Sequence, residues 1–139
     1  MIPFARANLE MKTRLRCDHP LADQVSVAYW NVNSLGPLNS QKRFINKLKG
    51  MKDNIYILED TRLNVGDEKP FKKLWGDMAY FNSYCWNRRG ITALIKNGTP
   101  ITDIEWENVI PGNFSKPSFR LNKQKTLLNA YTHQIKIVI

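Results

Sequence analysis

The sequence predicts an α+β fold, in which helices and strands pack as layers. Two strand–helix units come first along the chain, and a series of strand-like segments follows them. The 139 residues correspond to about one domain, and 42% apolar with 24% charged residues is ordinary for a globular protein. The order of elements leaves a layered α/β arrangement open as the alternative.

The N-terminal part of the chain divides at about residue 25. Residues 1–24 show no clean period, so an irregular basic lead-in, or a short helix, is expected before a domain that spans residues 25–139. Residues 25–30 are β-branched and aromatic and predict the first strand. A polar loop with the breaker pair Gly36-Pro37 follows that strand.

Apolar residues at helical spacing predict a helix over residues 41–51, with Ser40 as its N-cap. The short apolar run 55–58 is typical of a strand buried on both faces. A second short helix is expected over residues 68–75. The later strand candidates are residues 78–84, 91–96, 101–109, 118–121, 126–131 and 135–139.

The charge balance favours a polyanionic partner. The 21 basic and 12 acidic residues give a net charge of +9, and no acidic residue follows Glu107. Nucleic acid is the first candidate for such a surplus, and an anionic membrane surface is the second. The alternative is a solvated basic surface that only maintains solubility.

Other features indicate the compartment. No stretch approaches the roughly 20 consecutive apolar residues of a membrane-spanning helix, so no membrane insertion is expected. The N-terminus has no apolar signal region, which argues against secretion. Cys17 and Cys85 are 68 positions apart and fit a reducing environment. An intracellular protein, in the nucleus or cytoplasm, is therefore expected.

Polar residues follow two of the predicted strands. Asn31 and Asn33 come after the first strand, and Glu59 and Asp60 come after residues 55–58. In layered α/β sheets, ligand sites lie outside the carboxyl ends of the strands, where amide and carboxylate oxygens suit Mg²⁺. The alternative is that the asparagines only form a turn and that Asp60 caps the next segment.

Several segments, taken in order, resemble one family. Together they are similar to the endonuclease/exonuclease/phosphatase family, and within it to the endonuclease domain of non-LTR (LINE-type) retrotransposons. The segments are Tyr29-Trp30-Asn31-Val32-Asn33-Ser34-Leu35, Lys42-Arg43, and residues 55–63, 74–76, 80–83, 87–95, 112–114 and 126–131.

The resemblance implies roles for five residues. Asn31 would help to orient a metal ion and the phosphate, and Asn33 would occupy the next active-site position. Asp60 would be the metal-binding carboxylate, one methylene shorter than the usual glutamate, and Glu59 stands where glutamine is usual. Tyr131 would contact the scissile phosphate. The implied cofactor is Mg²⁺, with Mn²⁺ as a substitute.

The resemblance covers only the N-terminal half of the family domain, over residues 25–139. After Tyr131 the family has a small residue, proline and asparagine, whereas this chain has Thr132, His133 and Gln134. The second half would carry an Asp-x-Asn pair that activates water and a final Asp-His pair. Residues 134–139 contain neither. The chain alone is therefore expected to be inactive, because hydrolysis needs metal, water activation and charge stabilisation together.

The family fold, like that of DNase I, consists of two packed sheets. A half-domain would therefore be a partial sandwich, a single mixed sheet with helices on one face. Its other face would be apolar and open, so a second copy or a partner subunit is expected to cover it.

DNA is the substrate that the resemblance implies, and RNA would offer the same phosphates. The runner-up function is a catalytically silent basic module, nucleic-acid-binding or structural, within a larger assembly. A generic α+β nucleic-acid binder would retain the charge without the metal. The predicted phosphate-binding residues are Arg62, Arg88, Arg89, Lys116, Arg120, Lys123 and Lys125.

Overall fold

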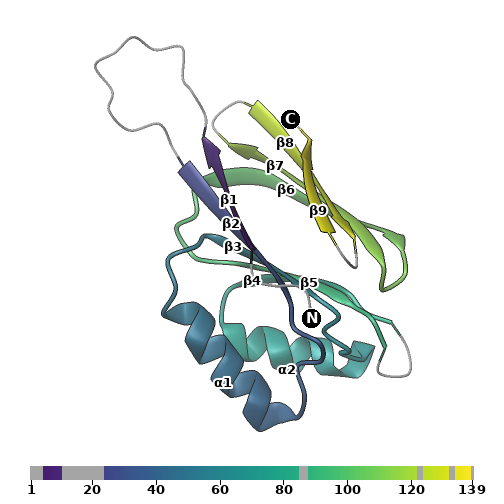
Figure 1. Ribbon diagram of the computed structural model, residues 1–139. Coiled ribbons are helices and arrows are strands. Elements are labelled where there is room, and N and C mark those ends of the chain that lie inside the picture. Colours follow the sequence, from purple (N-terminus) through teal and green to yellow (C-terminus); the bar gives the residue numbers. More distant parts are fainter. Residues whose placement is uncertain (1–4, 11–23, 85–87, 122–123, 132–133, 139) are drawn as a thin grey trace.

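A computed structural model describes residues 5–10, 24–84, 88–121, 124–131 and 134–138 (Figure 1). The α+β fold class is confirmed, because two helices pack on a mixed sheet and a second, antiparallel sheet follows them in the chain. Figure 1 shows three layers, with the helices on one side, the mixed sheet in the middle and the second sheet on the other side.

The mixed sheet has the strand order β1-β2-β3-β5-β4. Its parallel pair is β2 (Gln24–Asn31) and β3 (Ile55–Glu59), and the other neighbours pair antiparallel. β5 (Ile91–Ile95) lies between β3 and the edge strand β4 (Met78–Asn82). Every residue of β3 and β5 is buried, as the apolar run 55–58 predicted for a strand covered on both faces.

The other edge of this sheet corrects the prediction for the lead-in. Ala5–Glu10 form β1, which pairs antiparallel with β2 over its whole length, from Ala5 opposite Tyr29 to Glu10 opposite Gln24. The sequence gives no clear alternation in this segment, and pairing with a neighbouring strand supplies the order that local pattern lacks. The rest of residues 1–24 lies outside the described part, except Gln24.

The two helices cover one face of the mixed sheet. α1 (Leu38–Lys49) begins after Pro37 at its N-cap, so the prediction of Ser40 as the cap is wrong and Ser40 lies inside the helix. α2 (Val65–Trp75) begins earlier than predicted, because the Asp67 carboxylate accepts a hydrogen bond from the Asn64 N–H at 3.0 Å. Apolar residues of both helices pack against those of β2, β3, β4 and β5.

A second sheet of four antiparallel strands has the order β6-β7-β8-β9. The strands are β6 (Ile101–Ile110), β7 (Phe114–Leu121), β8 (Gln124–Tyr131) and β9 (Gln134–Val138). The sequence predicted these strands in part but not that they form a sheet of their own. The expectation of a single mixed sheet is therefore wrong.

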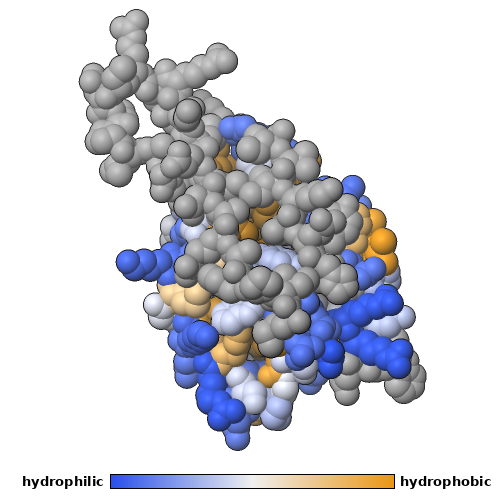
Figure 2. Space-filling model, viewed as in Figure 1, coloured by the Kyte–Doolittle hydropathy of each residue, from blue (hydrophilic) through white to orange (hydrophobic). Residues whose placement is uncertain are grey.

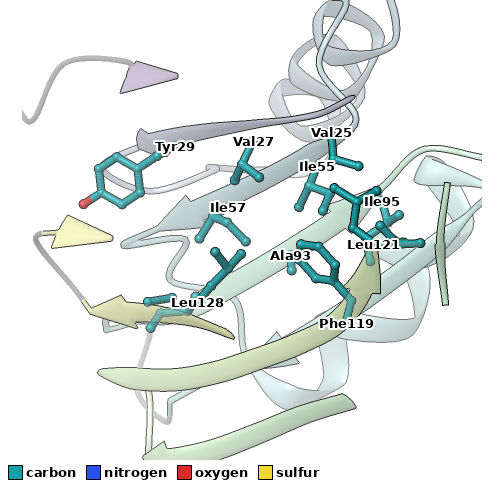
Figure 3. Close-up of a cluster of buried hydrophobic side chains, with 13 residues drawn as sticks. Val25, Val27, Tyr29, Ile55, Ile57, Ala93, Ile95, Phe119, Leu121 and Leu128 are labelled. Atoms are coloured by element: carbon teal, nitrogen blue, oxygen red, sulfur yellow. The ribbon is translucent and has the colours of Figure 1, made fainter. Parts of the chain in front are cut away.

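The second sheet covers the face of the mixed sheet that the helices leave open. Val27, Ile57 and Ala93 from the mixed sheet share one buried cluster with Phe119 and Leu128 from the second sheet (Figure 3). The open apolar face predicted from the sequence is thus buried by the chain itself. This removes the reason for expecting a second copy or a partner subunit on that face.

Candidate functional site

The carboxyl ends of β2 and β3 lie side by side, as the sequence predicted for a parallel pair. Asn31 is opposite Glu59 in the β2–β3 ladder. Beyond the strands the two loops stay hydrogen-bonded, because the Val32 N–H donates to the Glu59 carbonyl at 3.0 Å and the Ser34 N–H donates to the Asp60 carbonyl at 2.7 Å. The polar residues of both loops are therefore held at one edge of the sheet.

Arg62 joins the two loops through its side chain. Its Nε is 3.1 Å from Asp60 Oδ1 and its Nη2 is 3.2 Å from Asp60 Oδ2, so the guanidinium contacts both carboxylate oxygens. The same Nη2 donates to Asn33 Oδ1 at 3.1 Å. Three oxygen atoms thus converge on one cationic group. The sequence placed Asp60 at a metal and Arg62 at a phosphate, and did not anticipate that they pair.

Asn31 has a local role in the same edge. Its Oδ1 accepts a hydrogen bond from the Asn33 N–H at 3.1 Å, and its side chain is buried. This hydrogen bond closes a turn, which was the alternative to a metal-binding role for Asn31. An amide oxygen has two lone pairs, so the turn leaves one acceptor position on Oδ1 for another contact.

Backbone conformation marks this edge as strained. Asn33, Ser34, Asp60, Arg62 and Arg89 have φ values of 49°, 79°, 53°, 55° and 55°. Among the described residues other than glycine, only Asp103 also has a positive φ. Left-handed conformations are unfavourable for side chains with a Cβ and concentrate at functional sites, where the surrounding structure maintains them.

The segment before β5 brings two more arginines to the edge. The Arg62 N–H donates to the Arg89 carbonyl at 2.7 Å, and the Thr61 N–H donates to the Gly90 carbonyl at 3.2 Å. A Cβ on Gly90 would lie 2.5 Å from Thr61 Oγ1, so only glycine permits this approach. Arg88 and Arg89 are exposed beside Arg62 as a result.

We call Asn31, Asn33, Asp60, Arg62 and Arg89 the strand-end cluster. Its members are the last residue of β2, residues of the loops after β2 and β3, and Arg89 from the segment before β5. Three of the basic residues predicted to bind phosphate, Arg62, Arg88 and Arg89, lie at or beside this cluster. The other described ones lie on the second sheet.

Glu59 is a buried carboxyl that the sequence predicted to lie with Asp60 at the polar strand end and, by the resemblance, to replace a glutamine. The Tyr29 hydroxyl donates to Glu59 Oε2 at 2.8 Å, and Oε1 has no hydrogen-bond partner in the described structure. The pKa of Glu59 is raised to about 8, mainly by burial; the Tyr29 hydrogen bond lowers it in part and the charge of Asp60 raises it. Burial and Glu59 also raise the pKa of the Tyr29 hydroxyl. Glu59 is therefore largely protonated at neutral pH.

The signal that could have found Glu59 is strand alternation. Ile55 and Ile57 point into the cluster between the two sheets, and residue 59 follows at the same period. A glutamate in this position of a fully buried strand has to enter the core, which its complete burial confirms.

The two basic residues of β7, Lys116 and Arg120, lie next to acids of β6. Arg120 Nε is 3.2 Å from Asp103 Oδ2, and Lys116 is opposite Glu107 in the β6–β7 ladder. Lys125 is opposite Arg120 in the next ladder. The acid-free stretch after Glu107 therefore does not form a uniformly basic surface, because β6 supplies carboxylates to β7.

Two predicted site residues stay untested. The Tyr131 backbone lies at the end of β8, opposite Phe114, but its side chain lies outside the described part of the chain. Lys123 lies outside the described residues altogether. Their contacts with phosphate stay predictions.

The oxygen donors of the strand-end cluster are of the kind that binds a hard divalent cation, but there are few of them. The Asp60 carboxylate and the Asn33 amide oxygen already converge on a cation, and such oxygens are the ligands that Mg²⁺ prefers. Within the described ranges, no group of three or more histidine, cysteine, aspartate and glutamate residues could hold a metal ion. The cluster by itself would therefore bind such an ion weakly.

No protein-family model matches this chain, and no curated protein matches it significantly. Neither α1 nor α2, the helices of the described part, is long and apolar enough to cross a membrane. The chemistry of the strand-end cluster is thus the principal guide to function.

Proposed function

We propose that this chain is a LINE-type, Mg²⁺-dependent endonuclease-like domain that binds DNA phosphates at the strand-end cluster and does not cleave DNA alone. The observation that carries the proposal is the convergence of Asp60, Asn33 and Arg62 at the carboxyl ends of a parallel strand pair. Strained backbone at five neighbouring positions supports a functional role for this edge.

The oxygen-bearing and the cationic residues at the cluster would have different functions. Asp60, with the amide oxygens of Asn31 and Asn33, would hold the metal ion, which when bound neutralises charge on a phosphate. Arg62, Arg88 and Arg89 would bind phosphate oxygens and orient the backbone, because guanidinium groups match phosphate geometry. RNA presents the same groups, and DNA is the substrate that the resemblance favours.

Water activation is the function that the cluster does not supply. Glu59, the carboxyl that precedes Asp60 in the chain, is buried and largely protonated at neutral pH. It is therefore a poor general base for a water molecule at the strand-end cluster. The 139 residues contain no Asp-x-Asn sequence, which the resemblance requires for this step. Binding without cleavage is therefore the expected activity of this chain.

The runner-up function is a catalytically silent basic module, nucleic-acid-binding or structural, within a larger assembly. One observation favours it: Arg62 already neutralises both carboxylate oxygens of Asp60, as a structural ion pair would. Metal binding separates the two functions, because the silent module needs no divalent cation at Asp60.

Metal binding should depend on Asp60. Calorimetric titration of the wild-type chain with Mn²⁺ is expected to give millimolar affinity, and Asp60→Ala should abolish binding because it removes the ionised ligand. Arg62→Gln should strengthen binding severalfold, since it removes the guanidinium that contacts the same oxygens. Glu59→Gln is the control and should retain binding. Equal binding by the wild type and Asp60→Ala would refute the metal assignment. Asp60-dependent nicking of plasmid DNA would refute the expectation that the chain alone does not cleave DNA.

Nucleic-acid binding at the strand-end cluster should be non-specific and steeply salt-dependent. Replacing two arginines in Arg88→Gln/Arg89→Gln should weaken binding of a short DNA duplex about tenfold. It should also lower the slope of log affinity against log salt by about 0.9 for each phosphate that the variant no longer neutralises. Lys52→Gln/Lys96→Gln removes equal charge at the end of β3 opposite to the cluster and should have little effect. Fluorescence anisotropy at several salt concentrations measures this, and an affinity that is independent of salt would contradict it.

A further inference from the structure

The outer surface of the helix layer is strongly basic and has no part in the proposed site. Figure 2 shows hydrophilic side chains along the edge of the molecule where Figure 1 places α1 and α2. All of the basic side chains of these helices are exposed. We call them the helix-layer cations: Lys42, Arg43, Lys47, Lys49, Lys69, Lys72 and Lys73.

Helix geometry explains why these residues point outward. Ile45 and Leu48 of α1 and Phe71 of α2 are buried against the mixed sheet. Residues four apart lie on the same side of a helix, so Arg43 with Lys47, and Lys69 with Lys73, form outward ridges. The layer therefore presents two rows of cations to solvent.

Acids lie near some of these cations, because Glu68 is four residues before Lys72 on α2 and Asp77 lines a shallow pocket with the lysines of α2, but no ion pair forms with them in the described part of the chain. In the described part of the chain, the ion pairs are Arg62 with Asp60 and Arg120 with Asp103, and neither includes a helix-layer cation. Lys49 Nζ donates to the Leu74 carbonyl at 3.1 Å, which leaves its charge uncompensated. The second sheet differs, because there the acids of β6 face the bases of β7.

Helix stability explains only part of this charge. Lys47, Lys49, Lys72 and Lys73 lie in the last turns, where cations complement the helix dipole. Lys42, Arg43 and Lys69 lie in the first half of their helices, where a positive charge gains nothing from the dipole. Their presence requires another reason.

The helix layer adjoins the strand-end cluster. A pocket of about 590 Å³ lies between the first turns of α1 and α2, and both Arg62 of the cluster and helix residues such as Leu38, Asp67 and Pro70 line it. No helix-layer cation lines this pocket and Asp67 does, so the pocket shows only that the cluster lies beside the N-terminal parts of both helices, from which a long polyanion could reach the helix-layer cations.

We propose that the helix-layer cations bind a second stretch of nucleic-acid backbone, outside the strand-end cluster. The inference takes nucleic acid as the ligand from the proposed function. A membrane surface fits less well, because the apolar sides of both helices are buried against the sheet and cannot insert into lipid. Phosphate binding needs only exposed cations that no acid neutralises, and the described part of this layer has them.

The test compares variants that remove the same charge from different surfaces. Lys69→Gln/Lys73→Gln removes the outward ridge of α2, and Lys52→Gln/Lys96→Gln is the control of equal charge at the end of β3 opposite to the strand-end cluster. Affinity is measured by fluorescence anisotropy with DNA duplexes of about one and about three helical turns. Each variant is first checked for unchanged circular dichroism and unfolding midpoint.

The helix variant is expected to bind the long duplex about three- to tenfold more weakly than the wild type. Its salt slope should fall by up to about two, since each phosphate left without its lysine accounts for about 0.9. The control should change affinity less than about twofold, and the short duplex should hardly distinguish the helix variant from the wild type because the cluster alone covers it.

Equal losses in the helix variant and the control would show a net-charge effect and overturn the inference. A helix variant that loses binding only to vesicles of phosphatidylserine and phosphatidylcholine would assign the surface to membranes and also overturn it. The Arg88→Gln/Arg89→Gln variant separates the two proposals. If Arg88→Gln/Arg89→Gln binds both duplexes normally while the helix variant is impaired, the strand-end cluster is not the phosphate-binding site and the helix layer is.

Discussion

Asn82→Ala is expected to lower the free energy of unfolding by about 2 to 3 kcal/mol, because the buried side chain of Asn82 joins the two sheets through hydrogen bonds to four groups. Its Nδ2, which carries two hydrogens, lies 3.0 Å from the Ile110 carbonyl, 3.1 Å from the Phe114 carbonyl and 2.8 Å from Ser115 Oγ, so two of these acceptors share one hydrogen. Its Oδ1 accepts from the Gly112 N–H at 2.8 Å. Alanine leaves the buried Gly112 N–H without this acceptor, whereas the Ile110 carbonyl keeps its bond from the Asn113 N–H and Ser115 Oγ keeps its bond to Asn108 Oδ1.

Asn108→Ala is the matched control for this variant. Asn108 also bonds to the mixed sheet, through its Nδ2 and the Phe81 carbonyl at 3.2 Å, but it is exposed. The Phe81 carbonyl keeps its bond from Trp106 Nε1, so the control should cost about 1 kcal/mol or less. Urea unfolding followed by tryptophan fluorescence measures both variants. Similar costs for both would show that Asn82 does not join the sheets in this way.

Glu59→Gln should make the protein more stable than the wild type in alkaline solution, by about 2 kcal/mol or more near pH 9. The folded state raises the pKa of Glu59 to about 8, so it retains a proton that the unfolded chain loses near pH 4.3. Wild-type stability from this group is thus greatest at low pH and falls as the pH rises toward about 8. Each pH unit in this window costs about 1.4 kcal/mol.

Glutamine stays neutral and still accepts the Tyr29 bond, so the pH-dependent loss should disappear. Unfolding free energies near pH 6 and near pH 9 test this expectation, with Glu107→Gln at an exposed position as the control. An unchanged pH dependence in Glu59→Gln would mean that Glu59 is already ionised and solvated in the folded protein.

Part of the site could be predicted because it depends on strand order alone. Asn31 and Asp60 follow consecutive strands with a helix between them, and such strands pair in parallel, so their carboxyl ends meet. The contact of Arg62 with Asp60 and Asn33 could not be predicted. It depends on left-handed conformations at Asn33, Asp60 and Arg62, which only the surrounding loops enforce.

By itself the sequence determined the α+β class, the two helices and most of the strands, because periodicity is a local property of a chain. The tertiary structure decided what those elements cover. Pairing between β6, β7, β8 and β9 produced a second sheet that buries the apolar face of the first. It also placed acids of β6 beside the bases of β7. Burial of Glu59 and convergence on Arg62 likewise depend on contacts between residues far apart in the chain, which no local pattern encodes.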